Sequence, residues 1–246
     1  MKRIILFLVL IIVACNCKDF PQDISQCKTG DVKCIANTIT DILHTQFKGH
    51  NGLHLVSTDP LKINSLELPK NPASPVSVEL KFKNIVLTGI SQAVVKEVRG
   101  FDADPGKSVF EIYATIPSLT LAGPYSVNGK VLILPIVGEG KSVIKFDDMD
   151  VSIKLKTKVV QKDGKEYMEI QRTKLNLSPR NIHFFLENLF NGDKTLGDNM
   201  NKFLNENSHD IFNELKPSIV DAISAIITAV ANGPFSKYPY SDLFLQ

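Results

Sequence analysis

The chain has 246 residues, of which 43% are hydrophobic and 22% are charged, with 14 Gly, 13 Pro and no Trp. This is the composition of an ordinary globular protein, and it excludes a disordered chain, a collagen and a coiled-coil array. Lysine and arginine total 28 against 26 for aspartate and glutamate, with no long run of one sign. A nucleic acid is not expected as a partner, because binding phosphates requires a concentrated basic surface.

The N-terminus has the pattern of a secretory signal. Lys2 and Arg3 precede an unbroken apolar run over residues 4–14, which is shorter than the roughly 20 residues that cross a bilayer. We therefore expect residues 1–17 to be a signal peptide and residues 18–246 to form one secreted, extracellular domain. The ending Ile12-Val13-Ala14-Cys15 also fits a bacterial lipobox, which would anchor the chain through Cys15 instead. No other stretch is expected to approach a membrane span.

Removal of the leader leaves two cysteines, Cys27 and Cys34. Thiols pair in an oxidising compartment, so the sequence predicts one disulfide. The alternative, a metal site, has no support, because this spacing is not that of a zinc site and the histidines form no matching pair. So short a loop stabilises the fold by only about 2 to 3 kcal/mol.

A first helix is predicted after the cysteine loop. Asp31 is a good N-cap, and apolar residues then recur at steps of three and four until Gly49. They are Val32, Ile35, Ile39, Ile42 and Leu43. The helix is amphipathic, and Cys34 fixes its start.

From about residue 54 to residue 177 the apolar period is two, as in half-buried strands. The alternation is clear over residues 76–82, 110–116 and 149–159. Asp163-Gly164 predicts a hairpin turn into residues 167–177, because both positions tolerate positive φ. Gly138-Glu139-Gly140 is expected to be a turn between strands. Strands of about ten residues joined by short turns predict an antiparallel sheet.

A helical period returns over about residues 198–231 and ends at Asn232-Gly233-Pro234. Pro217 lies inside it, so we expect a kink there. After Ile219 the helix is apolar over most of its circumference, and such a helix must be surrounded by protein. We therefore predict an α+β fold in which a strongly curved antiparallel β-sheet wraps one long C-terminal helix. Side chains do not easily fill so large a wrap, and the remaining space would be a long apolar tunnel.

Several blocks of sequence, in order, resemble the insect takeout family, which is related to the haemolymph juvenile hormone binding proteins. Cys27 and Cys34 match in place and spacing, and the resemblance covers nearly all of the mature chain. Ser208-His209 departs from it, because similar members usually carry a Trp there, and this bears on the local helix packing. The matching blocks are GPYSVNGK (123–130), LPI (134–136), GEG (138–140), NLFNGDK (188–194), LGDNMN (196–201), FLNEN (203–207), IFNELKP (211–217) and YPY (238–240).

The resemblance implies a secreted, non-enzymatic carrier of small hydrophobic molecules, such as a terpenoid like juvenile hormone, a fatty acid or another long-chain lipid. It also implies the tubular lipid-binding fold, in agreement with the wrap inferred from periodicity, and it argues against the lipobox anchor. The sequence contains no G-x-S-x-G, H-E-x-x-H, Walker loop or paired Cys/His motif. We therefore expect no enzyme, no catalytic residue, no metal and no organic cofactor.

The strand and helix periods indicate which side chains point inward, but they do not separate plain core from cavity wall. Tyr113, Tyr125 and Tyr167 are candidate donors to a polar group of the ligand, because a phenol can lie in an apolar wall with its hydroxyl paired. A surface position is the simpler reading of each tyrosine. The predicted ligand-binding residues are Val78, Leu80, Phe82, Phe110, Ile112, Ile116, Tyr125, Ile153, Leu155, Phe203 and Ile219.

Two other functions are compatible with the sequence. One is a secreted interaction or signalling protein with a filled interior, acting through a partner surface such as that of an unknown receptor. The other is a membrane-touching lipid exchanger that uses the apolar tail over residues 235–245, although this tail is expected to tuck against the sheet. We expect a monomer without stable membrane insertion. Asn176-Leu177-Ser178 is an N-glycosylation sequon, and Pro179 directly after it disfavours its use.

Overall fold

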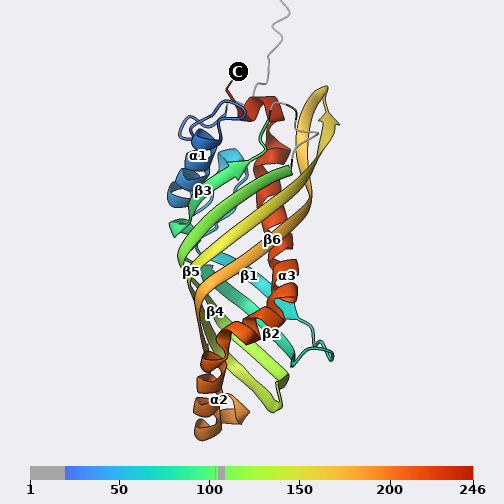
Figure 1. Cartoon of the computed structure of the whole chain (residues 1–246). Coiled ribbons are helices and arrows are strands. Elements are labelled where there is room, and N and C mark those ends of the chain that lie inside the picture. The colour runs from blue at the N-terminus through green and yellow to red at the C-terminus, as the bar shows by residue number, and fades with distance from the viewer. Residues whose placement is uncertain (1–19, 103, 105–108, 246) are drawn as a thin grey trace, which may run out of the picture.

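The computed structural model describes residues 20–102, 104 and 109–245. Figure 1 shows an elongated molecule in which a curved sheet and a long helix run side by side, with α1 and the C-terminus at one end and α2 at the other. The predicted α+β class, with its long C-terminal helix, curved antiparallel sheet and shorter N-terminal helix, is confirmed. The predicted signal peptide, residues 1–17, lies outside the described residues.

The sheet is antiparallel, with the strand order β1-β2-β4-β5-β6, and β3 pairs with the first part of β4. Asp163 and Gly164 form the predicted turn between β5 and β6, with φ of 52° and 73°. The GEG block, predicted to be a turn, lies inside β5. The strands are β1 (Leu61–Leu68), β2 (Val76–Thr88), β3 (Val94–Arg99), β4 (Val109–Val131), β5 (Leu134–Lys162) and β6 (Lys165–Leu186). Short 3-10 helices are η1 (Asn51–Leu53), η2 (Ile90–Gln92), η4 (Phe190–Gly192) and η5 (Tyr240–Leu243).

The alternation of side chains in the long strands is interrupted once near the middle. In β5 every second residue faces inward up to Phe146. Two residues instead of one, Asp147 and Asp148, then separate Phe146 from the next inward-facing residue, Met149. Asp148 has a φ of 48°, the kind of local distortion that a bulge introduces into a strand. The face of the strand that points to the core is therefore kept on both sides of the interruption.

The neighbouring strands carry the same interruption at the same level. In β4 the inward pattern passes from Ile116 to Leu119, and in β6 from Pro179 to Ile182. Ile116 pairs with Met149, and Met149 pairs with Pro179, so the three interruptions form one row. The pairing register is unchanged across this row, because each strand carries the same extra residue.

A second row crosses β1 at residues 64–65 and β2 at residues 83–84, again in register. A bulged strand bends and twists more strongly, so these rows curve the sheet while the same face stays inward. The predicted strands over residues 76–82 and 110–116 stop where an interruption begins, and the one over residues 149–159 starts where an interruption ends. This explains why the predicted strands are shorter than those observed.

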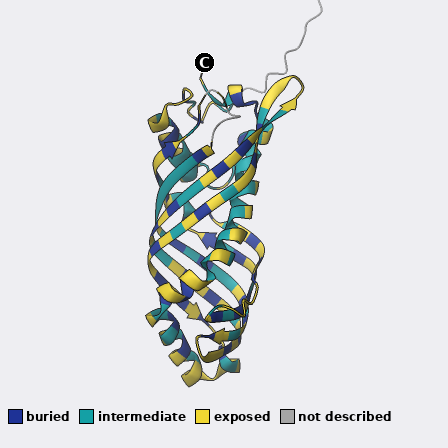
Figure 2. Ribbon diagram, turned by 45° about the vertical axis from the view of Figure 1, so that its right-hand side comes forward, coloured by how far each residue is buried: buried dark blue, intermediate teal, exposed yellow. Residues whose placement is uncertain are grey.

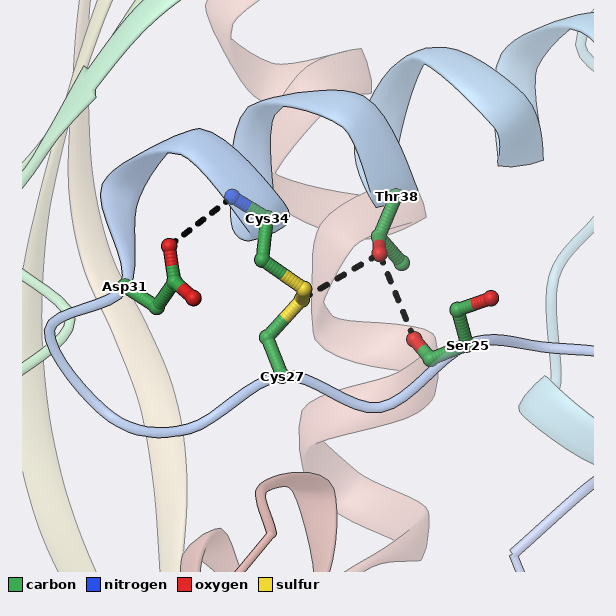
Figure 3. The surroundings of a disulfide bond; sticks show 5 residues. All are labelled: Ser25, Cys27, Asp31, Cys34 and Thr38. Carbon is green, nitrogen blue, oxygen red and sulfur yellow. Dashed lines mark hydrogen bonds between the residues drawn. A yellow bond between two sulfur atoms is a disulfide. The ribbon is translucent and has the colours of Figure 1, made fainter.

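The N-terminal helix and the disulfide form one local unit. α1 (Val32–Thr45) begins as predicted, with the Asp31 carboxylate accepting a hydrogen bond from the Cys34 N–H at 3.1 Å. The predicted disulfide joins Cys27 to Cys34, with their Cα atoms 5.7 Å apart. Figure 3 shows Thr38, one turn later, between this disulfide and the Ser25 carbonyl, to which its hydroxyl donates. The cap and the disulfide together fix where the chain enters the domain.

Two helices, α2 (Lys194–Glu206) and α3 (Ser208–Lys237), occupy the segment for which one helix is predicted. The chain leaves the helix at Asn207, whose backbone N–H and side chain both donate to the Phe203 carbonyl. α3 stays helical through Pro217 and Pro234 and ends later than predicted. Figure 1 shows the first turns of α3 running obliquely to its long remaining part.

α3 lies between the two edges of the sheet. It packs along β6 and also contacts β1 and β2 at the opposite edge. From Pro217 to Ala229 every fourth residue of α3 is exposed to water, and Figure 2 shows exposed and partly buried bands along the helix. The sheet therefore wraps the inner face and flanks of α3, and the expectation of a helix enclosed on every side is wrong for this stripe. The stripe consists of Pro217, Asp221, Ala225 and Ala229.

α3 is also long and apolar enough to cross a membrane, judged by length and composition alone. The expectation that only the leader approaches a membrane span is therefore wrong. In the fold, Ile211 and Phe212 of α3 are buried in the core, and later isoleucines pack against it. After Phe212 no residue of α3 is fully buried, and these isoleucines lie only partly buried against the sheet.

Asparagine side chains, rather than another strand, complete the edge of β6. Asn201 of α2 accepts a hydrogen bond from the Leu186 N–H and donates one to the Leu186 carbonyl, both at 2.9 Å. Asn205 makes the same two bonds with Phe184 at 2.8 Å. Asn201 and Asn205 are four residues apart on a helix, a rise of about 6 Å, and Phe184 and Leu186 are two residues apart on a strand, a rise of about 6.7 Å. Each asparagine therefore lies level with the strand residue that it binds. α2 thus takes the place of a missing neighbour strand.

Replacing both asparagines, Asn201→Ala with Asn205→Ala, should lower the free energy of unfolding by about 2 to 5 kcal/mol, because two backbone N–H and two carbonyl groups lose their partners. Chemical denaturation measures this. Asn199→Ala is the matched control, since Asn199 lies exposed on the same helix, and it should change stability by less than about 0.5 kcal/mol. Equal effects of the double variant and the control would contradict the proposed edge closure.

Candidate functional site

The end of the molecule beside α2 is closed by densely packed side chains. Leu189 is 1% exposed and Tyr125 4%. The Tyr125 hydroxyl donates a 2.7 Å hydrogen bond to the Glu187 carbonyl. Burial raises the pKa of Tyr125 to about 12. The phenol is therefore neutral and already paired within the protein.

The GEG block explains how the chain can cross this end so closely. Leu189 forms a β-bridge to Gly138, and a Cβ on Gly138 would lie 3.0 Å from the Leu189 Cα. A Cβ on Gly140 would lie 2.8 Å from the Glu187 carbonyl oxygen. Side chains at either glycine would push residues 187–189 away from β5. These glycines therefore serve the closure of the end.

Aromatic rings close the opposite end. Phe110 is fully buried and stacks on Phe101, with ring centroids 4.2 Å apart. Phe235 and Tyr240 lie next to Phe110, each with centroids at 6.4 Å. The Tyr240 hydroxyl donates to the Asp102 carbonyl at 2.7 Å, and burial raises the pKa of Tyr240.

The C-terminal tail is part of this second closure. The Leu245 N–H donates to the Cys27 carbonyl, and the Tyr238 hydroxyl donates to the Gly52 carbonyl, both at 2.8 Å. Tyr238 and Tyr240 are only 3% and 4% exposed. The tail is tucked against the domain as expected, so it does not provide the free apolar surface that a tail-driven lipid exchanger would need.

Between the two closed ends lies a set of inward-facing apolar side chains that are only partly buried. Ile112 and Ile153 pair across β4 and β5, central strands of the sheet, and both face the core clusters. An inward-facing side chain on a central strand stays accessible only where nothing fills the space before it. We call this set the central apolar zone: Ile112, Ile116, Phe146, Ile153 and Leu177 from the strands, and Ile219, Ile223, Ile226 and Ile227 from α3.

The structure divides the predicted ligand-binding residues into two groups. The first group is packed into the buried clusters toward the two ends: Val78, Leu80, Phe82, Phe110, Tyr125 and Leu155. The second group is partly accessible and packs against those clusters: Ile112, Ile116, Ile153, Phe203 and Ile219. Which of them contact a ligand stays a prediction, and the partly accessible group provides the better candidates.

Two of the candidate tyrosine donors lie elsewhere. Tyr113 alternates with Ile112, and its hydroxyl donates to the Glu111 carboxylate at 2.6 Å on the outer face, which raises the pKa of Tyr113. It borders a shallow outer depression of about 270 Å³. Tyr167 lies in the β5–β6 hairpin, with its ring 5.7 Å from the Lys162 Nζ. Neither tyrosine faces the central apolar zone.

Sequence reasoning missed several members of the central apolar zone. Phe146 is concealed because the alternation restarts just after it, at Met149. Leu177 is the last residue of a predicted strand, and its side chain faces inward like the alternate residues before it. The helical period that selects Ile219 also selects the remaining three, Ile223, Ile226 and Ile227.

The central apolar zone contains no ionisable side chain, so its chemistry is to take apolar surface out of water. Over residues 20–102, 104 and 109–245, no group of three or more His, Cys, Asp or Glu side chains could hold a metal ion. Polar atoms at the two ends are engaged with backbone carbonyls, as shown for Tyr125 and Tyr240.

Comparison with known proteins agrees with this geometry. The sequence profile of the family described as Haemolymph juvenile hormone binding protein matches residues 5–245. The chain belongs to this family. The predicted takeout and juvenile hormone binding protein family is confirmed by this match, and the fold is shared with a solved structure, Epiphyas postvittana Takeout 1, at a TM-score of 0.79 and 23% identity over 90% of this chain and 99% of that chain.

Two curated relatives are similar over most of their length. Both are the circadian clock-controlled protein daywake, from Drosophila yakuba and Drosophila melanogaster. Each is 25% identical to this chain over 92% of it and 88% of the relative. Family and fold are those of proteins that bind or carry small hydrophobic molecules, and the chain shares both with the haemolymph juvenile hormone binding proteins.

Tyr125→Phe tests whether this residue closes the end or contacts the ligand. The variant should lose about 1 kcal/mol of stability, because the Glu187 carbonyl loses its donor. The raised pKa means that Tyr125 contributes stability fully below pH 10 and loses it as pH rises toward 12. The alkaline fall in stability should therefore be shallower in the variant. The affinity for a fluorescent fatty acid should change less than about twofold. A larger loss of affinity would mean that Tyr125 contacts the ligand.

Proposed function

We propose that the protein is a secreted, extracellular carrier that holds one small hydrophobic molecule against the central apolar zone. The observation that supports this most directly is the Ile112–Ile153 pair, which faces inward from the middle of the sheet and yet is only partly buried. Both ends of the molecule are closed by packed rings and paired hydroxyls. An apolar guest lying along α3 would complete the burial of the isoleucines.

The free energy available for such binding is that of desolvation. Burying apolar surface gains about 25 cal/mol per Å², so about 300 Å² of a hydrocarbon chain or an isoprenoid would give about 7 kcal/mol before ordering costs. That is consistent with micromolar binding or better. Since the zone offers no charged group, length and shape should select the ligand more than its head group does. A terpenoid, a fatty acid and another long-chain lipid all meet this requirement.

The first experiment asks whether the purified protein contains a guest. The chain would be secreted from insect cells, purified without detergent, and analysed by native mass spectrometry and by organic extraction. We expect a co-purifying lipid or terpenoid at up to one molecule per protein. A protein that is empty and takes up no fluorescent fatty acid would instead favour the interaction protein with a filled interior.

The second experiment places the guest. Ile112→Arg or Ile153→Arg puts a cation into the central apolar zone, and each should lower uptake of a fluorescent fatty acid by at least about tenfold, because a buried unpaired charge is costly. Ser152→Arg is the matched control, since Ser152 neighbours Ile153 and faces outward beside Tyr113. The control should retain uptake within about twofold. Secretion yield and circular dichroism would show that each variant folds. Unchanged uptake by folded Ile112→Arg and Ile153→Arg would contradict the assignment of the ligand to the central apolar zone.

A further inference from the structure

The outer face of the β5–β6 hairpin concentrates positive charge that the rest of the chain does not share. Residues 154–174 contain seven lysines and arginines but only three acidic residues, whereas the whole chain has a formal charge of +2. All seven basic side chains are exposed. The remainder of the chain therefore carries a slight net negative charge, and the positive charge is concentrated in this hairpin.

Two cross-strand pairs in this region bring like charges directly opposite each other. Lys154 pairs with Lys174, and Lys156 pairs with Arg172. Like charges in directly opposed positions destabilise a sheet. We call these four residues the basic block.

Only one member of the basic block is neutralised. The Lys154 Nζ donates to the Glu111 carboxylate at 2.7 Å, and this contact is the main reason that the pKa of Glu111 is lowered. Within the part of the chain that the structure describes, Lys156, Arg172 and Lys174 have no carboxylate within 4.0 Å. The nearby Glu169 is engaged by Lys158 at 2.9 Å. Three cations therefore face outward without a carboxylate partner among the described residues.

The shape of the region favours a flat partner. β4 begins at Val109, opposite Lys156, and among the described residues β5 and β6 pair only with each other beyond this level, as a two-stranded ribbon. Figure 1 shows the ribbon projecting at the end of the molecule that carries the C-terminus. Near its tip, Val160 pairs with Tyr167, and both side chains are partly exposed. Cations flanked by half-exposed apolar and aromatic side chains suit an interface where charge and hydrocarbon lie side by side.

We propose that the basic block, with the tip of the β5–β6 ribbon, docks the protein on the surface of a membrane rich in anionic phospholipids. Each lysine or arginine near such a surface contributes about 1 kcal/mol, so the block gives reversible attachment rather than insertion. This docking differs from the tail-driven exchanger, because the tail is tucked. It also goes beyond the carrier function, since attachment does not require a bound guest.

The test is a double charge reversal, Arg172→Glu with Lys174→Glu, in the full secreted chain. Each new glutamate lies opposite a lysine, so both like-charge pairs become opposite-charge pairs, and the melting temperature should stay equal or rise. Co-sedimentation with vesicles of phosphatidylcholine containing about 30% phosphatidylserine should weaken by at least about tenfold. Wild-type binding should disappear on vesicles of phosphatidylcholine alone and weaken steeply as salt is raised.

The matched control is Lys62→Glu with Lys83→Glu, which changes the net charge equally at exposed positions on β1 and β2. It should bind the anionic vesicles within about twofold of the wild type. Equal losses in both double variants would mean that net charge alone acts and would overturn the site. Absence of wild-type binding at low salt, or binding to heparin beads under conditions where the vesicles are not bound, would overturn the membrane assignment.

Fatty acid uptake by the same variants separates this inference from the carrier function. The basic block lies on the outer face, so Arg172→Glu with Lys174→Glu should take up the fluorescent fatty acid as the wild type does. Retained uptake with lost vesicle binding is the expected result. Lost uptake together with lost vesicle binding would show that the substitutions disturb the fold and would contradict the assignment of these residues to the outer surface alone.

Discussion

The structure depends on how a single curved sheet satisfies its two edges and its apolar inner face at once. An antiparallel sheet that does not close on itself leaves unpaired backbone groups along both outer strands. Here α3 packs along β6 and contacts β1 and β2, so one helix covers the inner face and spans both edges. Where α3 does not reach, Asn201 and Asn205 of α2 pair with the β6 backbone. Asn232 of α3 accepts from the Ile170 N–H in the same way further along β6.

The interior that results is closed at its ends and less filled in its middle. Large rings pack at the ends, with Phe101, Phe110 and Tyr240 on one side and Tyr125 on the other, while Phe212 packs edge-on against Phe146 of the central apolar zone. The middle is lined mostly by isoleucines, which reach less far across the space between the sheet and α3. Side-chain size along the axis therefore decides where the protein packs against itself and where a guest could complete the packing.

The sequence predicts the architecture better than its details, for identifiable reasons. Periodicity locates α1, the Asp163-Gly164 turn and the inward face of each strand, because these depend on local patterns. It does not locate the full length of β4, β5 and β6, since the alternation restarts at Pro117, Asp148 and Arg180. It predicts one helix with a kink at Pro217, whereas hydrogen bonds to the Phe203 carbonyl end α2 at Asn207, and α3 stays helical through that proline. The candidate site is harder still, because alternation marks Phe82 and Ile112 alike as inward-facing, and only their packing shows that the first is sealed and the second is not.

The row of interruptions across β4, β5 and β6 has a consequence for how this chain can change over time. Deleting one of the residues near the interruption in a single strand would turn every side chain beyond it to the wrong face and would also shift its pairing with both neighbours. Deleting the matching residue from all three strands would restore both. Length changes in these strands should therefore occur as concerted sets at distant positions of the chain, whereas insertions at the β5–β6 turn are free of this constraint.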